Sequence, residues 1–148
     1  MVWTEYMISI LLAAVLGGVI GLERAFSGKA AGVRTNILIC LGAAAFTLVS
    51  RQMLGEEGSI ARIAAQVVTG VGFLGAGAII QDRGGVHGLT TAATIWLVAA
   101  IGMACGAGLY LLGASVTGVG FIVLVALRNV GNRLEQVASE HRHKDEES

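Results

Sequence analysis

Long apolar runs separated by short charged clusters dominate this chain. The runs cover residues 7–22, 36–49 and 63–80, and a further stretch at 89–127 contains no charged residue. A transmembrane helix needs about 20 mostly apolar residues, so each of the first three runs predicts one span with its flanking residues. As one helix the last stretch would be about 58 Å long, nearly twice a hydrocarbon core, and it therefore predicts two helices. We expect the turn between them in the glycine-rich segment 105–108.

The charged clusters give the predicted bundle an orientation. With five spans and an outside N-terminus, most of the basic residues fall on the cytoplasmic side, as they do in membrane proteins generally. The cytoplasmic set is Arg24, Lys29, Arg34, Arg83, Arg128, Arg133, Arg142 and Lys144, and the outside set is Arg51 and Arg62. The pattern thus predicts an all-α, polytopic integral membrane helical bundle of about five transmembrane helices, N-terminus outside and C-terminus cytoplasmic. The first run has no Lys or Arg before it, which argues against a cleaved signal peptide.

Composition supports a membrane protein. The chain is 55% hydrophobic, only 14% charged and free of proline, with a mean hydropathy of +0.76, which lies outside the usage of soluble domains. Ten basic and ten acidic residues cancel, and no basic stripe suggests nucleic acid as a partner. The expected partner is the lipid bilayer. We divide the chain into a transmembrane domain at 1–127 and a short polar cytoplasmic tail at 128–148.

The many glycines predict close helix packing. In lipid, apolar side chains gain little by leaving the tails for a neighbouring helix, so association depends on close backbone approach. We interpret eight of the 22 glycines as helix-packing positions: Gly17, Gly21, Gly70, Gly72, Gly75, Gly77, Gly102 and Gly106. Their density in the third run predicts that this helix lies at the bundle centre. An alternative is that they allow a kink which exposes carbonyl groups to an ion.

Several polar residues need an explanation inside or beside the spans. Arg62, Gln66 and Thr69 share one face of the third helix, either as hydrogen-bonding contacts between helices or as the lining of a polar path. Glu23 is an acid at a basic membrane boundary. It could pair with Arg24 or Arg34, or contribute to a cation site.

Threonines near the helix starts are predicted caps. Thr35 or Asn36 would cap the second helix, and a threonine of the pair Thr90 and Thr91 would cap the fourth. The two cysteines, Cys40 and Cys105, lie inside apolar runs, where a free thiol behaves as a small hydrophobe. We find neither a catalytic set nor a phosphate loop, so we expect no enzyme, and the chain offers no metal-spaced His or Cys cluster.

Four segments resemble the MgtC/SapB family of bacterial membrane proteins. They are GLER at residues 21–24, GVRTNIL at 32–38, RIAAQVVTGVGFLGAGAII at 62–80 and GLTTAATIWLVAAIG at 88–102. The resemblance covers roughly residues 7–127, in order and at compatible spacings. It implies a multi-pass protein of the bacterial inner membrane, linked to growth at low magnesium and in some bacteria to survival inside host cells. Several family members carry a soluble C-terminal domain, whereas this sequence ends in the polar tail.

The resemblance also implies which positions matter. The family-motif polar residues here are Glu23, Arg24, Arg34, Thr35, Arg62, Gln66, Thr90 and Thr91, and the pattern further includes Gly32, Gly70, Gly72, Gly75, Gly77, Gly88, Leu89 and Trp96. Two functions stay open. The first is a membrane protein that supports adaptation to low magnesium by modulating another membrane protein. The second is a Mg²⁺ transporter acting as a homo-oligomer. No cofactor is expected beyond Mg²⁺, as effector or substrate, and any metal ligands are unassigned.

Overall fold

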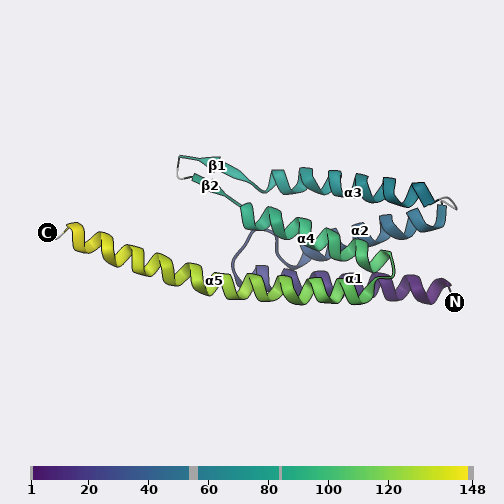
Figure 1. Cartoon of the computed structure of the whole chain (residues 1–148), viewed down its shortest axis with the longest axis horizontal. Coiled ribbons are helices and arrows are strands. Elements are labelled where there is room, and N and C mark those ends of the chain that lie inside the picture. Colours follow the sequence, from purple (N-terminus) through teal and green to yellow (C-terminus); the bar gives the residue numbers. More distant parts are fainter. Residues whose placement is uncertain (1, 54–56, 84, 147–148) are drawn as a thin grey trace.

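A computed structural model describes the backbone of residues 2–53, 57–83 and 85–146, and the side chains of residues 3–52, 63–83 and 85–128. In this part of the chain five helices run back and forth beside one another (Figure 1). They are α1 (Val2–Phe26), α2 (Val33–Met53), α3 (Glu57–Gly77), α4 (Leu89–Gly106) and α5 (Tyr110–Glu146), and a small hairpin of β1 (Ile80–Asp82) and β2 (Gly85–His87) joins α3 to α4.

Four of these helices are long and apolar enough to cross a membrane. The qualifying segments are Trp3–Phe26, Val33–Gln52, Leu89–Gly106 and Tyr110–Arg128. The apolar part of α3, Ile63–Gly77, is shorter. The prediction of an all-helical membrane bundle is therefore confirmed, with four clear spanning candidates and a fifth, shorter apolar helix.

The central helix is α4, and the prediction that the third helix holds this place is wrong. α4 packs against all four other helices, whereas α3 packs mainly against α4 and α2. Within its membrane segment 56% of α4 is buried, compared with 28% for α1 and 17% for α5. α4 is more buried because other helices surround it, and Gly102 and Gly106 let its backbone approach α2 closely.

The charge-free stretch at 89–127 does form two helices, as predicted. α4 ends in a Schellman motif, in which Leu109 N–H donates to the carbonyl of Ala104 and Gly108 N–H to that of Cys105. Gly108 has a φ of +80°, a left-handed conformation that favours glycine. α1 ends in the same way at Gly28, whose φ is +65°. Neither helix end needs a proline to stop it.

The hairpin between α3 and α4 departs from the sequence expectation, which extended the third helix through Ile80. α3 ends at Gly77, and Ile80 instead pairs with His87 across the two strands. Gly88 is the N-cap residue of α4; it has a φ of +86° and provides no side-chain cap. Glycine is required at this position for two reasons. The left-handed backbone disfavours other residues, and a Cβ would overlap the carbonyl oxygen of Ala78. The prediction that a threonine caps α4 is wrong.

The best-buried core lies between α1, α2 and α4. Ala13 and Ile20 of α1, Cys40 and Ala44 of α2, and Val98, Ile101 and Cys105 of α4 form one cluster. Both cysteines are free thiols packed in this cluster. Mostly small side chains in the core bring the three backbones close, which is how membrane helices gain packing contacts.

α5 runs on well beyond the bundle. Its first half, to Arg128, is the spanning candidate, and the backbone stays helical through the predicted polar tail to Glu146. In Figure 1 this second half projects past the other helices. The composition break near Leu127 therefore falls within one continuous helix.

Candidate functional site

Most of the family-motif residues gather at one end of the bundle, which we call the hairpin end. Glu23 and Arg24 lie in the last turn of α1, Arg34 lies in the first turn of α2, and Thr90 and Thr91 lie in the first turn of α4. Figure 1 shows the end of α1, the start of α2, the hairpin and the start of α4 at the same end of the bundle. Segments far apart in the sequence thus share this end because the helices alternate in direction.

A buried charged cluster occupies the last turn of α1. Arg24 Nε donates to Glu23 Oε2 at 2.6 Å, and both side chains are only 3% exposed. Ser27 Oγ donates to Glu23 Oε1 at 2.6 Å, and Arg128 Nη1 in turn donates to Ser27 Oγ at 2.6 Å. Of the alternatives left open for Glu23, the structure has the pairing with Arg24. Ser27 and Arg128 complete the cluster and hold α5 against α1.

Sequence reasoning missed the role of these two residues. Ser27 follows Glu23 by four positions, one helical turn, so a local contact could have been inferred. Arg128 lies 101 residues further along the chain from Ser27, and no periodicity signals that pairing.

Asn36 braces the loop between α1 and α2. The side chain is fully buried, and its amide donates to the carbonyl oxygens of Ala31 at 2.7 Å and Gly32 at 2.9 Å. The helix has already begun at Val33, so neither Thr35 nor Asn36 occupies a cap position. The prediction of a cap at these residues is wrong, and the asparagine acts on the preceding loop instead.

The polar stripe of α3 faces outward. Gln66 and Thr69 are exposed, and Thr69 Oγ1 donates to the carbonyl of Ala65 in its own helix at 3.0 Å. The side chain of Arg62 lies outside the described residues. Ala65, Gln66, Thr69, Phe73, Ala76 and Gly77 are all exposed and follow one another at helical spacing, and we call them the outer face of α3. This face does not pack within the described bundle.

The eight candidate packing glycines fall into two groups. A Cβ on Gly17 would lie 2.7 Å from Cβ of Cys40, and one on Gly21 would lie 2.7 Å from Cα of Val33. Gly102 and Gly106 lie even closer to α2, and Gly75 has ordinary contact with Ala92. At Gly70, Gly72 and Gly77 no described atom lies within 4 Å of the added Cβ. Half of the set therefore packs tightly within the protomer, and most of the α3 glycines do not.

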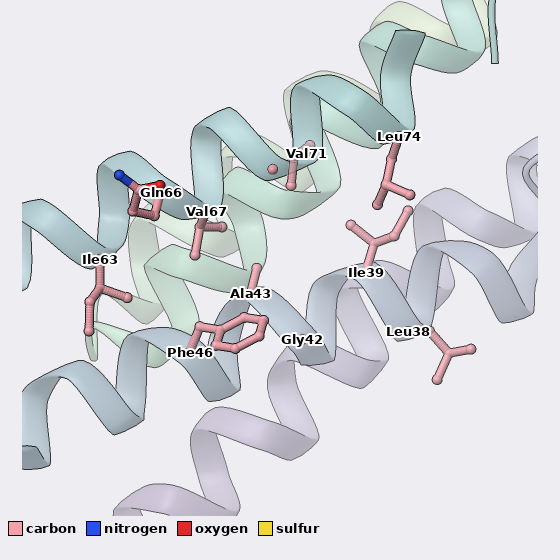
Figure 2. A pocket seen from close by; sticks show the side chains of 11 residues that line it. Leu38, Ile39, Gly42, Ala43, Phe46, Ile63, Gln66, Val67, Val71 and Leu74 are labelled. Atoms are coloured by element: carbon pink, nitrogen blue, oxygen red, sulfur yellow. The ribbon is translucent and has the colours of Figure 1, made fainter. Parts of the chain in front are cut away.

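An apolar groove runs between α2 and α3 (Figure 2). Its main cavity has a volume of about 450 Å³, and it adjoins a second cavity of about 390 Å³ that shares Leu38, Ile39 and Leu74 with it. Figure 2 shows Ile63, Val67 and Leu74 of α3 pointing towards α2, while the amide of Gln66 turns away from it. The second cavity reaches the hairpin end and is lined there by Arg34, Thr35, Gly77 and Ala78. We call the two cavities together the α2–α3 groove.

The fold and this site define a polytopic helical membrane protein whose motif residues gather at one basic end. The chain belongs to the MgtC family, whose sequence pattern matches residues 10–133. It is 45% identical over 137 residues to "Putative magnesium transporter YhiD" of Escherichia coli K12, an alignment that covers 88% of this chain and 64% of YhiD.

Two further relatives carry the name protein MgtC. The one from Brucella abortus is 50% identical over 125 residues, covering 84% of this chain and 50% of its own length. The one from Salmonella typhimurium LT2 is 42% identical over 137 residues, covering 93% and 58%. This chain thus spans between half and two thirds of the length of these relatives. No solved structure matches it.

Proposed function

We propose that this protein supports bacterial adaptation to low magnesium by binding and modulating another protein of the inner membrane, without catalysing a reaction. The observation that carries the proposal is the outer face of α3. α3 belongs to the longest segment that resembles the family, yet Gln66, Thr69 and Phe73 are exposed in the described bundle. Residues that do not serve the packing of their own protomer are available to a second membrane helix.

The chemistry of this face suits such a partner. Small residues, Ala65, Ala76 and Gly77, allow the backbone of another helix to come close, and Phe73, which is 78% exposed, offers a large contact surface. Gln66 can donate and accept hydrogen bonds across the contact. In lipid alone the amide of Gln66 would lack such partners, so association with a helix satisfies it better.

The proposed topology has five spans, with the N-terminus outside and the hairpin end in the cytoplasm. With 21 residues, α3 is about 31 Å long, which is enough to cross a hydrocarbon core although only part of it is apolar. The hairpin end carries Arg24, Lys29, Arg34, Arg83 and Arg128, whereas Arg51 lies at the opposite end. A basic end is retained in the cytoplasm, which supports this orientation.

A Mg²⁺ transporter that acts as a homo-oligomer is the second candidate. Gln66 and Thr69 favour it, because in a ring of protomers the outer faces of α3 could together line a polar path. The printed name of YhiD also refers to magnesium transport. Glu23 counts against it, because both of its carboxylate oxygens are already held by Arg24 and Ser27.

Growth at limiting magnesium tests the role of the outer face. Ala76→Trp places a bulky side chain on this face, and Ala114→Trp places the same side chain on an exposed position of α5 as a matched control. In a host that lacks its own copy, we expect Ala76→Trp to lose growth support at unchanged membrane abundance, while Ala114→Trp retains it. Equal growth support from the two variants would overturn the proposed surface.

A further inference from the structure

The α2–α3 groove is shaped for a long apolar ligand. Its walls are aliphatic and aromatic side chains of two helices, among them Leu38, Phe46, Val67 and Leu74. Gly42 and Gly70 widen it, since no described atom lies within 4 Å of the place where either Cβ would be. From Arg34 to Phe46 the groove follows α2 for 13 residues, about 18 Å, which is close to the depth of one bilayer leaflet.

The hairpin end of the groove is cationic. Arg34 lines the groove there, is exposed, and takes part in none of the ion pairs between described residues. Thr35 beside it offers a hydroxyl group, and both residues lie in the first turn of α2, where backbone N–H groups point outward and the helix dipole is positive. An anion at this position gains a charged partner and hydrogen-bond donors together.

We propose that the α2–α3 groove binds one anionic phospholipid, with an acyl chain along the groove and the phosphate group at Arg34 and Thr35. Apolar walls of leaflet depth select a lipid chain, and the cationic end selects a headgroup with net negative charge over a zwitterionic one. This site adjoins the outer face of α3, with which it shares Gln66 and Gly77. The α3 side chains Ile63, Val67 and Leu74 that line it point towards α2. The lipid would fill the space between α3 and α2 and steady α3, which has few packing neighbours of its own.

Lipid binding to the purified full chain tests the proposal. Native mass spectrometry would compare phosphatidylglycerol with phosphatidylcholine of the same acyl chains. We expect Arg34→Gln to weaken phosphatidylglycerol binding about fivefold, the effect of one basic residue at a membrane surface, and to weaken phosphatidylcholine binding less. Lys29→Gln is the matched control, because Lys29 is an exposed cation of the same end that does not line the groove.

A second pair of variants tests the apolar part. Gly42→Leu fills the groove where there is open space, and Gly118→Leu adds the same side chain at an open position of α5. We expect Gly42→Leu to weaken both lipids at least fivefold and Gly118→Leu to weaken neither. The proposal is overturned if Arg34→Gln and Lys29→Gln have equal effects, which would mean diffuse surface attraction. It is also overturned if Gly42→Leu binds phosphatidylglycerol as the wild type does.

Discussion

Gly102 of α4 lies directly against the backbone carbonyl of Cys40 in α2, so that a single added methyl group would overlap that carbonyl oxygen. Gly106, one helical turn later, is held in the same way against Ala44 and Thr47. These two contacts set the separation of α2 and α4, and the core of Cys40, Val98 and Cys105 forms around them. The small residues of α4, rather than those of α3, organise the bundle.

Gly102→Ala should therefore destabilise the protein by about 1–3 kcal/mol, the usual cost of overpacking, because the backbone of α2 must move aside. Gly118→Ala is the control at an open helical position, where alanine should be neutral or stabilising by up to about 1 kcal/mol. Thermal unfolding of both variants in detergent micelles measures the difference. Similar midpoints for the two would mean that the Gly102 contact does not fix the helix spacing.

Within the charged cluster, loss of the buried Glu23 should destabilise the protein more than loss of the partly exposed Arg128. Glu23→Ala leaves the guanidinium of Arg24 buried without its carboxylate, and we expect a loss of about 3–5 kcal/mol. Arg128→Gln removes a partly exposed partner, whose carboxylate contact is 3.8 Å long, and should cost no more than about 1 kcal/mol. Removing Glu23 and Arg24 together should restore part of the loss seen with Glu23→Ala. Unfolding midpoints test the series, and equal effects of the two single changes would refute it.

Gly88→Ala should damage the start of α4 more than Gly28→Ala damages the end of α1. Both glycines are left-handed, and this conformation costs another residue about 1–2 kcal/mol. Around Gly28 there is open space, whereas at Gly88 the new methyl group also meets the carbonyl of Ala78. Hydrogen exchange of the backbone amides in α4 measures this difference. We expect faster exchange in Gly88→Ala and unchanged exchange in Gly28→Ala. Unchanged exchange in that variant would contradict the predicted clash.

The proposed orientation predicts opposite labelling at the two ends of the bundle. Gln52→Cys should react with a membrane-impermeant thiol reagent in intact spheroplasts, and Lys29→Cys only after the membrane is permeabilised. Both positions are exposed, while the native thiols of Cys40 and Cys105 are fully buried and should stay silent. The reverse pattern would mean that the topology is inverted. Labelling of both positions from outside would mean that α2, which lies between them, does not cross the membrane.

Photo-crosslinking tests the proposed contact surface directly. A photoreactive phenylalanine analogue at Phe73 should give adducts in membranes of magnesium-limited cells, because this position lies on the outer face of α3. The same analogue at Leu111 of α5, which is 84% exposed, is the control and should give lipid adducts alone. An adduct of twice the protein mass would indicate a second copy as the partner. Indistinguishable patterns at the two positions would remove the support for a partner on α3.

The helices were largely predictable because hydrophobic run lengths and glycine breaks are local signals. The split of residues 89–127 follows from bilayer thickness, and the glycine-rich segment 105–108 located the turn. The hairpin was not predicted, because Ile79 and Ile80 continue the apolar run. No local signal reveals that Gly88 packs against the carbonyl of Ala78. Glycine density also misled the placement of α3, because a glycine tolerates close packing without requiring it, and only the tertiary structure shows which glycines are used.

The candidate site was predictable only in part. Glu23 and Arg24 stand out as charges at a membrane boundary, and their neighbouring positions in the sequence made the pairing a natural candidate. Arg128 joins them through Ser27 across 101 residues, a contact that depends on how α5 packs against α1. The α2–α3 groove depends likewise on the separation of two helices, which no single sequence pattern encodes.

Magnesium flux into liposomes that contain the purified protein tests the central claim most directly. The proposal that the protein modulates a partner predicts no flux above that of empty liposomes, for the wild type and for Gln66→Leu alike. Flux by the wild type that Gln66→Leu abolishes, at equal folding and equal incorporation, would contradict it and identify the outer face of α3 as a transport path.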